Sequence, residues 1–326
     1  TIMGAVNGPA SDEGRGWEVD KMSRESFKTF YEGYVRNVID ASKKVAPNAL
    51  QYIEIDSYEV GGQNWTKDYQ SYFKDELGYD IIEYLPLYAG RYIDNAETTE
   101  RILWDVRNFN SKLMTDNYFD YFTELCHEDG LISYVEPYSF NAGFNELDAT
   151  KNVDIPMGEF WMHQRYQAGT AASGARIYGK NIVSAESFSA HANINWKGHP
   201  GTLKLTGDKA WTLGINEFFF HRYTHQSNTH VEPGLTMFQW GSHIDRTQTW
   251  WDNAGQAWFK YLARGQYMLR QGIPVSNLLV FVGDGSPNSI VPRSSLKLKN
   301  QINYDCINAD ALVNRITGKD ETLNLP

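Results

Sequence analysis

Four glutamates stand at the ends of short apolar segments that are typical of buried strands. They are Glu59, Glu136, Glu159 and Glu186. Paired carboxylates are the working groups of glycoside hydrolysis, in which one delivers a proton to the leaving oxygen and the other attacks the sugar or activates a water molecule. A single acid in such a place is commonly a salt-bridged or capping residue. Burying several acids is costly without a function, so the four together predict an acid-lined pocket.

Other polar and aromatic residues near these segments are candidates for binding a sugar. Beside the glutamates Glu136 and Glu186, they are Asp56, His221, Arg222, Trp240 and His243. His221 and Arg222 follow the apolar segment 215–220, where they could bind hydroxyl groups, although a structural pairing of Arg222 with an acid is an equal alternative. The loop that holds Trp240 and His243 has the same two interpretations, a sugar platform or simple packing of the loop.

The apolar segments alternate with helical patterns along the chain. Strands are predicted near residues 52–56, 131–135, 153–158, 182–185, 215–220 and 275–282, and helices near 23–44, 67–77, 97–129, 162–178, 207–214 and 250–272. Strands that alternate with helices imply a parallel sheet with right-handed crossovers. The expected fold class is α/β, a (β/α)8 TIM-type barrel that is irregular or incomplete, because six or seven strands are found rather than eight. Such barrels keep their chemistry at the carboxyl ends of their strands, so we expect the four glutamates to converge there.

Composition excludes several classes of function. The 326 residues carry a formal charge of −10, which gives no basic surface for a nucleic acid. No apolar run reaches the roughly 18 residues of a membrane span. Aromatic residues make up 14% of the chain, with 10 Trp and 20 Tyr, which favours a site that stacks flat, hydroxylated ligands. We therefore expect a carbohydrate partner, and neither a nucleic acid nor a membrane.

The sequence contains no strong metal-binding motif. Its two cysteines, Cys126 and Cys306, form no CxxC pattern, and His221, His225 and His230 do not fit HExxH. Carboxylates would suit calcium better than zinc, but the pair Asp56 and Glu59 alone is weak support for any metal.

Several motifs resemble those of the α-L-rhamnosidases of glycoside hydrolase family 106, in the same order along the chain. They are the segments 13–18, 56–66, 156–161, 185–186, 220–223 and 241–243. The resemblance implies a (β/α)8-type catalytic domain, hydrolysis of terminal α-L-rhamnosides with inversion of configuration, and calcium in the active site. On this resemblance Glu59 matches the general acid and Glu159 the general base, with Glu186 or Glu136 as alternatives for the base.

Family members are usually much longer than this chain. We expect residues 1–300 to be the catalytic barrel and residues 301–326 to begin a following, truncated domain or a C-terminal extension. The chain opens on Thr1 without a signal-like segment, so we expect a processed or excised piece, of unknown compartment. Two other functions stay open: a retaining glycosidase that uses Glu136 as acid/base, and a sugar-binding barrel fragment without turnover.

Overall fold

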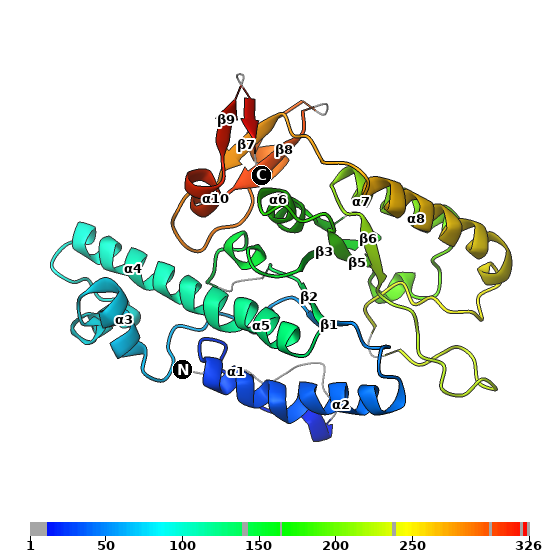
Figure 1. Cartoon of the computed structure of the whole chain (residues 1–326), viewed down its shortest axis with the longest axis horizontal. Helices are drawn as coiled ribbons and strands as arrows, with labels where there is room; N and C mark the ends of the chain where they lie inside the picture. The colour runs from blue at the N-terminus through cyan, green and yellow to red at the C-terminus, as the bar shows by residue number, and fades with distance from the viewer. Residues whose placement is uncertain are drawn as a thin grey trace. The chain divides into compact units, whose positions relative to one another are not determined.

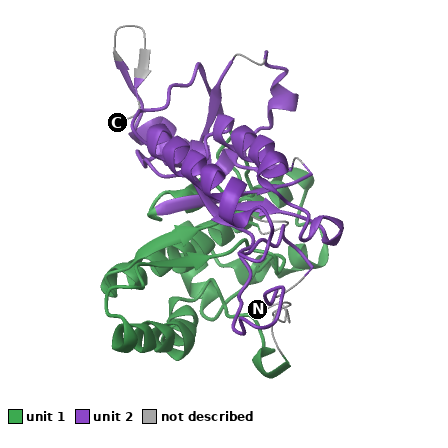
Figure 2. Ribbon diagram, turned by 90° about the vertical axis from the view of Figure 1, so that its right-hand side faces the viewer, with its two compact units in different colours: residues 1–154, 282–289 green, residues 155–281, 290–326 purple. Residues whose placement is uncertain are grey.

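The computed structural model describes residues 12–138, 143–163, 165–236, 239–299, 302–319 and 322–324. The chain divides into two compact units (Figure 2). Unit 1 holds residues 1–154 and 282–289, and unit 2 holds residues 155–281 and 290–326. This division lies elsewhere than the expected boundary near residue 300, which stays a prediction.

Unit 1 consists of helices and one pair of parallel strands (Figure 1). Its helical elements are η1 (Asp12–Gly14), α1 (Arg24–Phe30), η2 (Tyr31–Val35), α2 (Arg36–Val45), α3 (Tyr69–Leu77), η3 (Ile81–Ala89), α4 (Ala96–Met114), η4 (Thr115–Phe119), α5 (Asp120–Glu128) and η5 (Asp148–Thr150). Its strands β1 (Tyr52–Ile55) and β2 (Ile132–Val135) are paired along their whole length. The helices predicted over 23–44 and 97–129 are confirmed, each with one π-helical turn inside it.

Local sequence explains the helices that frame these strands. The Ser23 hydroxyl accepts the Ser26 N–H at 3.1 Å and so begins α1, where a polar cap satisfies an otherwise unpaired donor. The Phe27 ring packs edge-on against Tyr118 at 5.2 Å, which joins α1 to η4. Gly130, at φ 74°, follows the end of the continuous helical segment α4-η4-α5, just before β2. Glycine adopts this left-handed backbone conformation without strain.

Unit 2 contains the longer strands. Three of them, β3 (Ile155–Trp161), β5 (Ser184–Ser189) and β6 (Glu217–Phe220), pair in parallel in that order, and β4 (Tyr166–Gln167) pairs antiparallel with β3. The remaining elements are α6 (Gly169–Ile177), η6 (Ala192–Ile194), α7 (Pro200–Thr212), η7 (Trp251–Gly255), α8 (Gln256–Leu269), β7 (Leu278–Phe281), α9 (Arg293–Leu296), β8 (Tyr304–Ile307), α10 (Ala309–Asn314), β9 (Thr317–Lys319) and β10 (Thr322–Asn324). β7 pairs in parallel with β8, and β9 pairs antiparallel with β10.

The core of unit 2 is aromatic. Phe160 of β3, Phe188 of β5 and Phe218 of β6 contact one another, with ring centroids 4.9 to 5.5 Å apart. The helices α6 and α7 connect the parallel strands, as in the βαβ units of an α/β barrel. The mixed α/β class is thus confirmed. A complete (β/α)8 barrel is not, because the described strands β7 and β8 of unit 2 form a two-stranded sheet of their own, apart from the sheet that contains β3, β5 and β6.

Two predicted helices of unit 2 are wrong at their starts. Residues 162–163 and 165–168 are not helical, because the chain turns back after β3 and the Trp161 N–H bonds to the Arg165 carbonyl at 2.8 Å. Helix α7 begins at Pro200 rather than near residue 207, since His199 caps it and proline suits the first helical turn.

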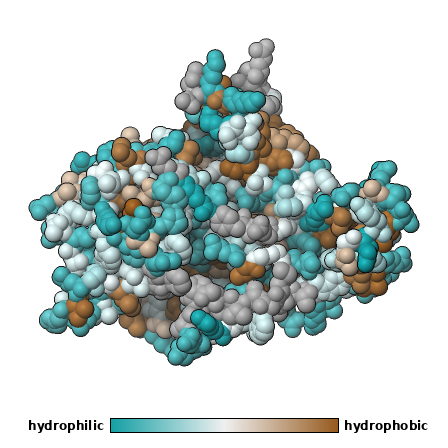
Figure 3. Space-filling view, turned by 180° about the vertical axis from the view of Figure 1, so that it is seen from behind, coloured by the Kyte–Doolittle hydropathy of each residue, from teal (hydrophilic) through white to brown (hydrophobic). Residues whose placement is uncertain are grey.

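The face of the molecule in Figure 3 is largely hydrophilic or neutral, with hydrophobic residues in separate small patches. Among the described residues, no helix is both long and apolar enough to span a membrane.

Candidate active site

In unit 1 the structure brings Asp56 and Glu136 together. The backbone N–H of Ser57 donates to the Asp56 Oδ1 at 2.8 Å and to the Glu136 Oε2 at 3.0 Å. The Tyr138 hydroxyl donates to the same Glu136 oxygen at 2.7 Å, and Glu136 is completely buried. The Glu136 N–H continues the β1-β2 ladder by bonding to the Ile55 carbonyl. The carboxyl end of this strand pair therefore holds two acids that share one peptide donor.

Glu59 lies four residues beyond β1 and is exposed. Its neighbour Tyr58 is buried, bonds through its N–H to the Tyr138 carbonyl at 3.3 Å, and lies under the Lys21 ammonium group at 5.3 Å from the ring centroid. The buried tyrosine thus fixes the loop from which Glu59 projects. Glu59 lines a cavity of about 890 Å³ in unit 1 together with Asp56 and Lys21.

The residues that follow motif segment 13–18 contact motif segment 56–66 in unit 1. Asp20, two residues after segment 13–18, accepts hydrogen bonds from Gln63 and, at 2.7 Å, from Thr66. The Lys21 ammonium pairs with Glu18 at 2.7 Å and is nearly buried. These bonds tie the chain before α1 to the loop after β1, which carries Glu59.

Glu54 is a titratable residue of the same cavity that sequence reasoning missed. It alternates with Ile53 and Ile55 along β1, so it lies on the same face of the strand as Asp56. Desolvation by the surrounding protein, and then the Asp56 charge, raise the pKa of the Glu54 carboxyl to about 7. The side chain nevertheless stays open to solvent on the side of the cavity. The available signal was a glutamate inside an otherwise apolar strand.

In unit 2 Glu159 and Glu186 are direct register partners on β3 and β5. Paired residues of parallel strands point to the same face, with their backbones about 4.8 Å apart. Glu159 is buried and forms an ion pair with Arg165 at 3.2 Å. Gly158 precedes it because β4 comes so close that a Cβ there would collide with the Gln167 carbonyl. The fold therefore brings two of the four predicted glutamates side by side.

Glu186 belongs to a chain of polar side chains. Its carboxylate accepts a hydrogen bond from Ser189 and lies 3.5 Å from the Nδ1 of His221. The Nε2 of His221 lies 2.7 Å from the Arg222 guanidinium. A bulge at Phe188, at φ 66°, shifts the register so that Trp161 pairs with Ser189, which re-aims the serine. Glu186, His221 and Arg222 are thus coupled.

Trp240 and His243 occupy different environments. Trp240 is 38% exposed, whereas His243 is buried. The His243 Nε2 lies 3.1 Å from the Trp240 carbonyl and 3.5 Å from the Asn195 amide, and its ring contacts Trp196 at 5.7 Å. These contacts fix the loop that presents Trp240. Sugar binding by either residue stays a prediction.

Of the four glutamates expected at strand ends, only Glu136 directly follows a strand. Glu59 lies beyond the end of β1, while Glu159 and Glu186 lie inside β3 and β5. The reason is that β4 and the bulge extend the pairing past both residues. The convergence of all four glutamates on one pocket stays a prediction.

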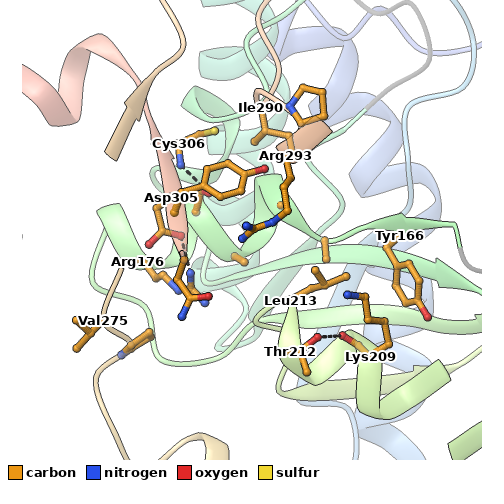
Figure 4. A pocket seen from close by; sticks show the side chains of 18 residues that line it. Tyr166, Arg176, Lys209, Thr212, Leu213, Val275, Ile290, Arg293, Asp305 and Cys306 are labelled. Atoms are coloured by element: carbon orange, nitrogen blue, oxygen red, sulfur yellow. Dashed lines mark hydrogen bonds and ion pairs between the residues drawn. The ribbon is translucent and has the colours of Figure 1, made fainter. Parts of the chain in front are cut away.

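A second cavity, of about 610 Å³, lies in unit 2 between α6, α7 and the segment around β8 (Figure 4). Arg176 and Asp305 form an ion pair at 2.5 Å on its wall. None of the predicted site residues lines it.

Comparisons with known proteins decide the family. The model of the glycoside hydrolase 106 family, described as alpha-L-rhamnosidase, matches residues 1–326. The chain belongs to this family. It is 39% identical over 308 residues to a Formosa agariphila protein named "Putative beta-glucuronidase", covering 94% of this chain and 26% of that protein. The structure matches a rhamnosidase from Novosphingobium sp. PP1Y with a TM-score of 0.86 and 27% identity, over 99% of this chain and 32% of that one. The chain thus spans about a quarter to a third of the length of these relatives.

Proposed function

We propose that this glycoside hydrolase family member hydrolyses terminal α-L-rhamnosides with inversion of configuration. The match of the family model over the whole chain carries the proposal. In it, Glu59 donates a proton to the leaving oxygen and Glu159 deprotonates the attacking water. The Arg165 cation beside Glu159 favours an ionised carboxylate, which a base requires. Glu59 is exposed, so it can reach a bound glycoside.

Asp56 and Glu136 are suited to hold calcium in this proposal. Both offer carboxylate oxygens beside one peptide N–H, and hard oxygen donors are the ligands that calcium prefers. When bound, the cation would draw the hydroxyl groups of a sugar to this strand end. Glu186, His221 and Arg222 would bind the sugar through hydrogen bonds.

The test is hydrolysis of 4-nitrophenyl α-L-rhamnoside by the protein, followed by proton NMR of the first sugar released. Inversion gives β-L-rhamnose first, and the retaining alternative with Glu136 as acid/base gives α-L-rhamnose first. Binding of rhamnose without release of nitrophenol would support the third possibility, a sugar-binding fragment.

A second candidate activity is the hydrolysis of β-glucuronides, favoured by the name of the Formosa agariphila relative. Arg222 beside His221 would offer a cation to a uronate carboxylate. A parallel assay with 4-nitrophenyl β-D-glucuronide separates the two, since turnover of the glucuronide alone would overturn the rhamnoside proposal.

A further inference from the structure

Four rings of unit 2 form one connected cluster, which we name the ring platform. Its members are Trp161, His163, His191 and Trp240. His163 and His191 stack at 4.7 Å with their planes 22° apart. The Trp161 ring lies 5.1 Å from His191, and the Trp240 ring lies 5.2 Å from His191. Every ring therefore contacts at least one other member.

Three separate segments assemble the platform at the carboxyl ends of β3 and β5. Trp161 is the last residue of β3, and His191 follows the end of β5 by two residues. The Gly241 N–H bonds to the Ala190 carbonyl at 2.7 Å, which brings Trp240 beside His191. Gly241 has φ 120°, so a side chain there would strain the approach. The backbone of the fold thus fixes the platform.

The platform differs from the aromatic core of the same unit by its exposure. His163, His191 and Trp240 are exposed, whereas Phe160 and Phe188 are completely buried. Rings that pack only for stability are normally covered, and an open aromatic surface is typical of a binding site. Partial burial, and then the charges of His191 and Arg165, lower the pKa of His163. This shift disfavours the charged imidazolium and so favours stacking of His163 in its neutral form.

One side chain connects the platform to the proposed base. The Arg165 guanidinium lies 5.7 Å from the Trp161 ring centroid and 3.2 Å from the Glu159 carboxylate. From this placement we infer that the ring platform binds the group released by hydrolysis, through the flat face of an aromatic ring or of a second sugar. The inference rests on the proposed function, because it places the released group next to Glu159.

The test compares three α-L-rhamnosides whose leaving groups are 4-nitrophenol, glucose and methanol. Trp240→Ala should lower kcat/KM about tenfold, mainly through KM, for the nitrophenyl glycoside alone or for both this glycoside and the disaccharide. For the methyl glycoside kcat/KM should change less than about twofold. Loss for the nitrophenyl glycoside alone indicates an aromatic aglycone, and loss for both indicates a general flat-face site. Trp240→Phe should restore most of the loss. Tyr267→Ala, which removes an exposed ring from α8, is the matched control.

Equal losses for all three substrates, or none, would overturn the inference. A wild-type protein that cleaves no rhamnoside would overturn the proposed function instead. The platform is then tested by itself, with NMR titration of the Trp indole N–H signals by the nitrophenyl and methyl glycosides. Tighter binding of the nitrophenyl glycoside that Trp240→Ala abolishes supports the platform, and equal binding of both glycosides refutes it.

Discussion

The two units hold their candidate acids in different ways. In unit 1, Glu136 and Asp56 accept hydrogen bonds from neutral donors, the Ser57 peptide and the Tyr138 hydroxyl. In unit 2, Glu159 faces the Arg165 cation, and Glu186 lies beside His221. The arginine of unit 2 compensates the negative charge of Glu159, whereas the hydrogen bonds from Ser57 and Tyr138 in unit 1 come from uncharged groups.

The strands of the two units also differ in where they carry the candidate acids. β1 and β2 have four residues each, and the candidate acids Asp56, Glu59 and Glu136 lie in the segments that follow them, whereas β3 has seven residues and contains Glu159. A side chain inside a paired strand is held more firmly than one in a loop. The difference favours a positioned base in unit 2 and a more adaptable acid in unit 1.

The largest expected effect separates the two catalytic roles. Glu159→Gln should lower kcat about a thousandfold for good and poor leaving groups alike, because every turnover of an inverting enzyme needs the activated water. Glu59→Gln should lower kcat by as much only for substrates with poor leaving groups, because these leave only when they are protonated. A series of aryl rhamnosides measures both variants, with Glu128→Gln at the exposed end of α5 as control. A leaving-group effect in the Glu159 variant alone would reverse the roles.

A smaller effect tests the charged partner in unit 2. Arg165→Gln should lower kcat about tenfold, since Glu159 loses the cation that positions it, and Arg165→Lys should recover much of the loss. Thermal unfolding of each variant distinguishes positioning from instability. If the lysine variant is as slow as the glutamine variant, a charge beside Glu159 is not what matters.

The protein should respond to calcium through the acids Asp56 and Glu136 of unit 1. Excess Ca²⁺ should raise Tm and a chelator should lower both Tm and activity, since a ligand that binds the folded protein stabilises it. Asp56→Asn should abolish the shift in Tm, and Asp148→Asn, an acid of η5 elsewhere in unit 1, should leave it unchanged. Identical Tm and activity with and without the chelator would remove calcium from the proposal.

Much of this arrangement was predictable from local patterns. The alternation of Ile53, Glu54 and Ile55 predicted β1, and the capping signal at Ser23 predicted the first helix. The extension of β3 past Glu159 was not predictable, because it depends on β4 returning to pair with it. The bulge at Phe188 likewise depends on packing against Phe160, which no local pattern encodes.

The sequence predicted which residues belong to the candidate site better than it predicted their hydrogen-bond partners. Apolar segments ending in acids drew attention to Glu136 and Glu186, yet the shared Ser57 N–H and the Ser189 link arise only from the folded backbone. His163 and His191 went unnoticed for the same reason. They lie 28 residues apart, and only the ends of two adjacent strands bring their rings together.

The smallest expected effect concerns the pH dependence of stability in unit 1. The pKa of Glu54 is about 7 in the folded protein, against 4.5 for an ordinary glutamate. Below pH 4.5 the carboxyl is protonated in both states and does not affect stability. Between pH 4.5 and 7 the unfolded chain ionises first, so the free energy of unfolding falls, and above pH 7 the loss is complete. Glu54→Gln removes this loss and should raise Tm by about 2 °C at pH 8, with no gain at pH 4. Thermal unfolding of the wild type, this variant and the Glu128→Gln control across the range measures the difference. A gain of the same size at pH 4 would mean that the variant acts through packing, and no gain at pH 8 would mean that Glu54 ionises normally.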